Sequence, residues 1–181
     1  MKLAKAYAFD TPIGKKTLAD LFDGRSQLMV YHFMLGPDWD AGCPGCSFMA
    51  DHFDAMLAHL NHHDVTLVAA SRAPLEKIQA YQRRMGWRFP WVSAHGGDFN
   101  TDFHVSFTAD DLAGETIDYN FVDLPVAQGH DEARGCRPSY RDADGSGFPH
   151  LFDLRARRRG TAGRPDAARP RAPWAATRKA A

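Results

Sequence analysis

Two segments of the chain are apolar almost without interruption over the length of a strand. Residues 27–35 read QLMVYHFML, and residues 64–71 read DVTLVAAS. A run without polar alternation is typical of a strand that is buried on both faces, as in a parallel sheet. The two segments are therefore predicted to form strands in the middle of a sheet.

Helical periodicity follows each of these strands. From Cys46 to Leu60 the apolar residues recur at spacings of three and four, which predicts an amphipathic helix. Residues 73–86 predict a second helix, because Pro74 suits a helix start and Gly86 suits a helix end. The order of these elements is strand, helix, strand, helix.

The rest of the pattern predicts shorter elements. Residues 7–18 suggest a hairpin, and residues 89–94 suggest a short third strand. Residues 95–115 are rich in turn formers, so we expect mostly loop there. Residues 139–148 are typical of an antiparallel strand with a tight Asp-Gly turn. Together the elements predict an α/β fold of three layers, with a mixed central sheet and helical crossovers between its parallel strands.

Charge divides the chain of 181 residues into two parts. Residues 1–153 are long enough for one hydrophobic core and hold 13 Lys and Arg against 21 Asp and Glu. Residues 154–181 hold 9 against 1 and are rich in Arg, Ala and Pro. Because residues 155–181 contain no Leu, Ile, Val or Phe, they cannot bury enough apolar surface to offset their ordering entropy. We expect one acidic domain and a basic, disordered tail.

The sequence favours a cytoplasmic protein. Its first ten residues lack the continuous apolar segment of a secretory signal, and no apolar run approaches the length of a membrane span. Three cysteines are too few for the disulfide scaffold of a small secreted protein. We therefore expect a reducing compartment and no membrane partner.

A C-x-x-C sequence, CPGC at residues 43–46, lies between the first predicted central strand and its helix. Free backbone N–H groups and the helix dipole favour the thiolate of a cysteine at a helix N-terminus. A second cysteine one turn further on can attack the mixed disulfide that the first one forms with a substrate. Cys43 is therefore predicted to be the nucleophile and Cys46 the resolving thiol. The carboxylates of Asp38 and Asp40, just upstream, would oppose a thiolate.

A zinc site is the alternative use of two cysteines at this spacing. It needs two further ligands, and the sequence has no second C-x-x-C. The histidine candidates are His52, His59, His62 and His63. His59 and His63 share a helix face, but they stand about three turns beyond the cysteines, too far along a rigid helix to complete the site. We expect these histidines to be solvated, and we expect no metal or other cofactor.

Aromatic residues gather in the sequence shortly after the second predicted helix. They are interpreted most simply as core residues, and the alternative is an apolar rim on which a thiol substrate lies. The nearby Arg83, Arg84 and Arg88 are expected to be solvated charges. The aromatic residues are Trp87, Phe89, Trp91, Phe99 and Phe103.

Three segments of the chain carry a likeness to a known family. They are residues 27–54, 65–103 and 140–145. Together they resemble the DUF899 family, bacterial proteins of uncharacterised function that are placed among the thioredoxin-like folds. The likeness covers roughly residues 7–147. It implies a thioredoxin-like domain of the peroxiredoxin-related kind and, by analogy, thiol-disulfide chemistry at Cys43 and Cys46.

The chain departs from this family near its predicted late strand. Thioredoxin-like enzymes place a cis-proline beside the dithiol, just before such a strand, and the nearest proline here is Pro138. Pro138 is predicted to fall inside the strand, where its missing N–H is unfavourable. We therefore do not assign it that role.

A second departure begins after residue 147. The family continues with a segment similar to VFHTYSTYARG and a closing helix, whereas this chain continues with FPHLFDLRARRRG. Reading GC-rich codons for the family segment one base out of register gives much of residues 149–155. Of the 27 residues from 155 to 181, 22 are Arg, Ala, Pro or Gly, whose codons are also GC-rich. We interpret residues 148–181 as the product of a frameshift.

These observations predict a thiol-disulfide oxidoreductase or thiol-dependent reductase that uses Cys43 and Cys46. Its partners would be thiols or disulfides of proteins or small molecules. One alternative is a peroxiredoxin-like peroxidase, in which Cys43 attacks a hydroperoxide and Cys46 resolves the sulfenic acid. Another is a binding module that uses the fold without redox turnover, or whose basic tail contacts nucleic acid. A solvated, accidental tail explains the same composition without such contacts.

Overall fold

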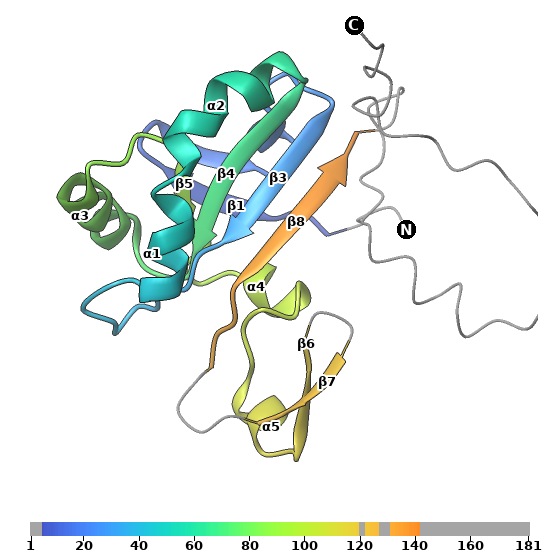
Figure 1. The fold of residues 1–181 in the computed structure, drawn as a ribbon. Coiled ribbons are helices and arrows are strands. Elements are labelled where there is room, and N and C mark those ends of the chain that lie inside the picture. Colours follow the sequence, from blue (N-terminus) through green and yellow to red (C-terminus); the bar gives the residue numbers. More distant parts are fainter. Residues whose placement is uncertain (1–4, 120–121, 127–130, 142–181) are drawn as a thin grey trace, which may run out of the picture.

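A six-stranded mixed sheet forms the centre of the protein (Figure 1). The structure is a computed structural model that describes residues 5–119, 122–126 and 131–141. The strands of the sheet are β1 (Ala8–Thr11), β2 (Gly14–Thr17), β3 (Gln27–His32), β4 (Val65–Ser71), β5 (Trp91–Ser93) and β8 (Gly135–Tyr140). Their order across the sheet is β2-β1-β5-β4-β3-β8.

Parallel pairing in the middle and antiparallel pairing on both sides define the topology. β4 pairs in parallel with β3 and β5. β1 runs antiparallel to β5, and β8 runs antiparallel to β3. β1 and β2 form a hairpin. The predicted hairpin, the central strands and the mixed sheet are thus confirmed.

Helices lie on both faces of this sheet (Figure 1). One face carries α1 (Pro44–Ala50), α2 (Phe53–His62) and α3 (Leu75–Met85). The other face carries the 3-10 helix η1 (Asp20–Phe22) and α4 (Phe99–Asp102). The predicted α/β architecture is therefore confirmed. None of the helices in the described ranges is long and apolar enough to cross a membrane.

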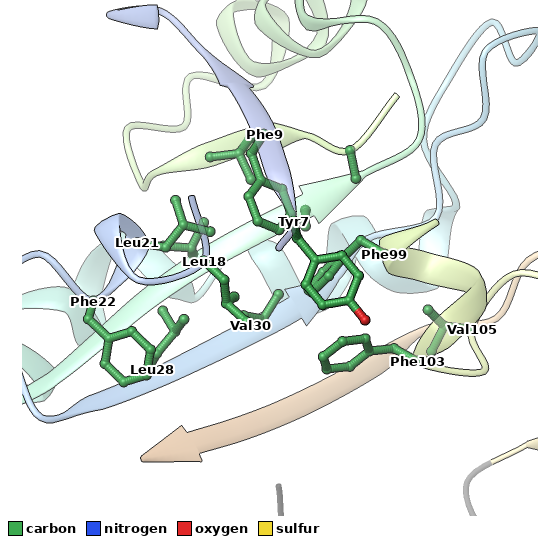
Figure 2. Close-up of a cluster of buried hydrophobic side chains, with 14 residues drawn as sticks. Tyr7, Phe9, Leu18, Leu21, Phe22, Leu28, Val30, Phe99, Phe103 and Val105 are labelled. Atoms are coloured by element: carbon green, nitrogen blue, oxygen red, sulfur yellow. The ribbon is translucent and has the colours of Figure 1, made fainter. Parts of the chain in front are cut away.

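Alternate residues of the central strands supply two hydrophobic cores. In β3, Leu28 and Val30 belong to the core beside η1 and α4, whereas Tyr31 belongs to the core beneath α1, α2 and α3. Figure 2 shows the first core, where the rings of Phe9 and Phe99 meet edge to face with centroids 4.7 Å apart. Full burial of one such side chain stabilises the fold by about 1.5–3 kcal/mol. Burial on both faces explains why the strand is continuously apolar.

The helix predicted over residues 46–60 is two helices, and the prediction of a single one is wrong. Between α1 and α2 the amide of His52 donates to the carbonyl of Met49, only three residues back, at 3.3 Å. Asp51 accepts a hydrogen bond from the indole N–H of Trp87 at 2.9 Å. The break between α1 and α2 is therefore stabilised by a side chain outside both helices, that of Trp87, which follows α3.

The segment expected to be mostly loop, residues 95–115, also contains α4 and α5 (Ala109–Leu112). α5 begins with a capping box, in which Thr108 and Asp111 each bond the backbone amide of the other. Two further strands, β6 (Thr116–Tyr119) and β7 (Val122–Pro125), pair in a separate two-stranded sheet. The sequence pattern did not predict this second sheet.

The late strand is β8, and it begins four residues before the predicted segment. Pro138 lies inside β8, opposite Met29 of β3. β8 is at the edge of the described sheet, a place that tolerates a proline. The predicted Asp-Gly turn and the predicted tail, residues 154–181, lie outside the described residues.

Candidate functional site

The two cysteines of the CPGC sequence lie at the start of α1, near the carboxyl end of β3 (Figure 1). Cys43 is the N-cap residue and is partly exposed, whereas Cys46 is fully buried. Pro44 occupies the start of the helix, where its missing N–H removes no helical hydrogen bond. Both thiols are free, and they interact with each other. The predicted position of the pair, between a buried strand and a helix, is confirmed.

Hydrogen bonds fix the backbone around Cys43. Its amide donates to the carbonyl of Met34 at 3.0 Å, and its own carbonyl accepts from the amide of Ser47 at 2.9 Å. The Ser47 hydroxyl donates to the same carbonyl at 3.1 Å and lies 3.1 Å from the Tyr81 hydroxyl of α3. The position of the Cys43 backbone is therefore set by the segment that follows β3 and, through Ser47, by α3.

Burial decides the state of the Cys46 thiol. It raises the pKa of Cys46 to about 11, because a thiolate would lose its hydration in the core. The backbone of Met34 and the hydroxyl of Tyr31 lower this pKa in part, since both can stabilise a thiolate. At neutral pH Cys46 is therefore a protonated thiol.

The Tyr31 hydroxyl lies close enough to the Cys46 thiol to influence its pKa. The pKa of Tyr31 is raised, first by burial and then by the neighbouring Cys46, so the hydroxyl keeps its proton. In the reduced protein this buried hydroxyl interacts with the Cys46 sulfur and makes no hydrogen bond to a nitrogen or oxygen atom of the described residues. It is therefore available to donate to a thiolate that forms at Cys46.

An arginine from a distant part of the sequence completes the site. Arg134 directly precedes β8, and its Nη1 lies 2.7 Å from the point where a Cβ atom would stand on Gly45. The sulfur of Cys43 lies 3.9 Å from the same point, so the guanidinium and the thiol are neighbours. A guanidinium at this place can pair with a negative group of a molecule that approaches the thiol. Arg134 is exposed and Cys43 partly so, which leaves both open to a substrate.

The five aromatic residues that are close in sequence belong to two different cores. The residues in the core beneath α1, α2 and α3 are Trp87, Phe89 and Trp91. Phe99 and Phe103 belong to the core on the opposite face of the sheet. The five do not form one substrate rim, and core packing is the interpretation that the structure supports.

The four histidines considered as zinc ligands are exposed, as expected. His52 contacts the ring of Phe48, and His62 contacts His63. Within the ranges that the structure describes, no group of three His, Cys, Asp or Glu side chains is arranged to hold a metal ion. The exposed positions of Arg83, Arg84 and Arg88 also agree with the prediction.

Sequence reasoning missed Tyr31 and Arg134. A signal for Arg134 was present, because a thioredoxin-like fold brings the residues just before a late strand next to the dithiol. Looking there only for a proline led to Pro138, which lies inside the strand. Tyr31 had no signal of its own, since the pattern shows it as one more apolar residue of a buried strand.

Solved structures that share this fold include peroxiredoxins. Peroxidoxin BcpB from Mycobacterium tuberculosis has a TM-score of 0.51 and 15% identity, with 82% of each chain covered. A mutant of PrxQ from Xylella fastidiosa has a TM-score of 0.51 and 13% identity, with 78% of this chain and 74% of that chain covered. A peroxiredoxin Q mutant from Xanthomonas campestris has a TM-score of 0.50 and 14% identity, with 81% and 83% covered. The class of protein is therefore a peroxiredoxin-like variant of the thioredoxin fold.

The chain belongs to the family described as "Bacterial protein of unknown function (DUF899)", which matches residues 1–160. The family resemblance drawn from the sequence is thus confirmed. A search of curated proteins gave no match. Because the family description assigns no activity, the function has to be argued from the site.

Proposed function

We propose that the protein is a thiol-disulfide oxidoreductase, with Cys43 as the nucleophile and Cys46 as the resolving thiol. The observation that carries the proposal is the unequal exposure of two interacting thiols. Cys43 is partly exposed at the N-cap of α1, and Cys46 is buried one turn further along. A substrate can reach Cys43 without opening the core, and the guanidinium of Arg134 lies beside the Cys43 sulfur.

The reaction proceeds in two exchanges. The Cys43 thiolate attacks one sulfur of a substrate disulfide, the substrate S–S bond breaks, and the first substrate thiolate leaves. Cys46 then loses its proton and attacks the Cys43 sulfur, which releases the second substrate thiolate. The substrate gains two electrons and the protein gains a Cys43–Cys46 disulfide. Two residues one helical turn apart at an N-terminus can reach the geometry of this bond.

A thiol peroxidase is the second candidate, and the charge of Arg134 beside Cys43 supports it. The Cys43 thiolate would attack one oxygen of a hydroperoxide, break the O–O bond and become a sulfenic acid. The other oxygen would leave as water or an alcohol after it takes a proton, and the guanidinium would stabilise its developing charge. Cys46 would then displace water from Cys43 and form the same disulfide.

Mass mapping of alkylated thiols tests both candidates against a binding module without redox turnover. Protein equilibrated at a series of redox potentials should pass from two free thiols to one Cys43–Cys46 disulfide. Cys136 is a third, exposed cysteine in β8, so Cys136→Ser is the matched control and should behave like wild type. Full, unchanged labelling of both Cys43 and Cys46 at every potential would exclude the enzyme and leave the binding module.

The roles of the two thiols are separated by substitution. Cys43→Ser should abolish exchange, whereas Cys46→Ser should trap a mixed disulfide, because only the resolving step is lost. Trapping by Cys43→Ser alone would reverse the two roles. Reduction of insulin disulfides without turnover of hydrogen peroxide would favour the oxidoreductase, and the opposite result would favour the peroxidase.

A further inference from the structure

Arg134 carries a charge that no carboxylate neutralises within the described ranges. The ion pairs of the neighbouring segment belong to Arg72, and the hydrogen bond at Arg134 involves its backbone carbonyl rather than its guanidinium. An exposed guanidinium that forms no ion pair with the described residues, next to a partly exposed thiol, presents a charge and a nucleophile to the same incoming molecule. A substrate with a negative group near its reactive sulfur fits this arrangement.

The backbone of Arg134 is held from several directions, so its position is set by the fold. Arg72, which follows β4, forms ion pairs with Asp131 and with the buried Glu132, both at 2.5 Å. The amide of Ala133 donates to the carbonyl of Val105 at 2.7 Å. These contacts fasten the segment before Arg134 to β4 and to the segment that follows α4.

A contact from the second sheet holds the residue itself. The hydroxyl of Tyr119, in β6, donates to the carbonyl of Arg134. Directly afterwards Gly135 begins β8 and pairs with His32 of β3. The guanidinium therefore projects toward α1 from a backbone that is fixed on both sides, and the missing side chain of Gly45 leaves the space that it occupies.

We propose that Arg134 determines specificity and that the protein prefers anionic disulfides, in which a carboxylate lies close to the sulfur that Cys43 attacks. This inference rests on the proposed oxidoreductase function and names its substrate class. The carboxylate pairs with the guanidinium while Cys43 attacks the sulfur. Bond making and breaking follow the two exchanges described above, so no further reactant is needed.

The positive charge of Arg134 lies within residues 1–153, a part of the chain whose net charge is negative. Residues 1–153 hold 13 Lys and Arg against 21 Asp and Glu, so this part of the chain repels an anion, whereas the full chain holds 22 of each and has no net charge. A preference for anionic disulfides would therefore come from the site and not from the overall charge. The net charge of residues 1–153 alone predicts the opposite preference and the zero net charge of the full chain predicts none, which makes these explanations distinguishable from a preference set by Arg134.

Single-turnover oxidation of the reduced, full-length protein tests the inference with three small alkyl disulfides. They are dithiodipropionate, which is anionic, hydroxyethyl disulfide, which is neutral, and cystamine, which is cationic. The rate constant for each is measured by acid quench, alkylation and mass spectrometry. When each rate constant is divided by that of the uncharged thiol 2-mercaptoethanol with the same disulfide, wild type should favour the anionic over the cationic disulfide, since this division removes the difference between the leaving thiols. Arg134→Gln should lower the ratio of the anionic to the cationic value about 10-fold, because one nearby, partly solvated charge is removed.

Two further variants serve as controls. Arg134→Lys keeps the charge and should keep most of the ratio. Arg83→Gln removes an exposed charge from α3 and should leave the ratio unchanged. Circular dichroism should show that Arg134→Gln is folded, since the Arg134 side chain is exposed.

The remaining outcomes separate failure of the specificity inference from failure of the proposed function. An equal ratio in wild type and Arg134→Gln overturns the specificity inference and leaves the oxidoreductase intact. So does an equal loss of rate with all three disulfides, because Arg134 would then act on the Cys43 thiolate and not on the substrate. If wild type reacts with none of the three and forms no Cys43–Cys46 disulfide, the proposed function fails as well.

Discussion

Nη1 of Arg134 lies 2.7 Å from the position that a Cβ atom of Gly45 would take. Gly45 is a helical residue of α1 and is not among the described glycines with positive φ. Its conformation is therefore one that any residue can adopt. What Gly45 supplies is space, and the guanidinium beside Cys43 fills that space.

Gly45→Ala should displace Arg134 without harm to the fold. The new methyl group would meet the far end of a flexible side chain, which can move aside. Alanine is favoured over glycine inside a helix by about 1 kcal/mol, so thermal unfolding should show equal or higher stability. The preference for anionic over cationic disulfides should fall toward that of Arg134→Gln. An unchanged preference would show that the contact has no part in specificity.

Tyr31→Phe should slow the resolving step and leave the first exchange unchanged. The Tyr31 hydroxyl lowers the pKa of Cys46, so its loss makes the Cys46 thiolate harder to form. The ring still packs on Phe53, whose centroid is 4.9 Å away. A donor to a charged group contributes about 1.5 kcal/mol or more, so the mixed disulfide should persist about 10-fold longer at pH 8. Quench-and-alkylate mass spectrometry measures this lifetime.

Tyr140→Phe is the matched control for that experiment. Tyr140 is an exposed tyrosine at the end of β8, so its hydroxyl should not affect the lifetime of the mixed disulfide. Equal lifetimes in wild type and Tyr31→Phe would remove Tyr31 from the mechanism.

The Cys46 thiol should make the reduced protein sensitive to alkaline pH. Burial raises the pKa of Cys46 from 9.0 to about 11, so the folded state holds this proton more tightly than the unfolded state. Stability is therefore lost as pH rises from about 9 to about 11. The loss is on the order of 2 kcal/mol for a fully buried group.

Denaturant unfolding of wild type and Cys46→Ala under reducing conditions measures this effect. At pH 7 Cys46 of the wild type is protonated, so the difference in unfolding free energy between the two proteins reports packing alone. Between pH 9 and pH 11 the advantage of wild type over the variant should shrink. A difference that stays constant over this range would contradict the pKa of Cys46 given above.

The apolar pattern predicted the centre of the fold and little of its periphery. β3 and β4 are buried on both faces, and this leaves an unmistakable continuous run in the sequence. The break between α1 and α2 leaves no such trace, because it depends on the hydrogen bond from Trp87 to Asp51, 36 residues apart. The sequence pattern does not reveal β6 and β7 either, since they form a small sheet outside the main one and are not buried on both faces.

The site was predictable to the extent that it is local in sequence. Cys43 and Cys46 are three residues apart, and the helix that follows them has a clear period. Arg134 comes to the dithiol through the pairing of β8 with β3 and through the ion pairs of Arg72. Such contacts depend on the folded chain, so no spacing rule in the sequence contains them.

The segment after residue 147 leads to the last prediction. We propose that the encoding DNA, read one base out of register from about residue 147, contains a strand similar to FHTYSTYARG and an apolar closing helix. The family match extends to residue 160, and the chain beyond it consists mainly of Arg, Ala, Pro and Gly. Nucleotide sequencing tests this directly.

The protein itself gives an independent test of the same idea. On the frameshift proposal the closing helix is lost, which would leave apolar surface exposed at about 25 cal/mol for each Å², and a helix of ordinary size covers enough for several kcal/mol. That is comparable with the whole stability of a domain, so the chain with its present tail should be only marginally stable. Limited proteolysis should remove residues 155–181 well before it cleaves the domain. Equal resistance of both parts, or the absence of an apolar pattern in either alternative frame, would refute the frameshift and require a function for the tail.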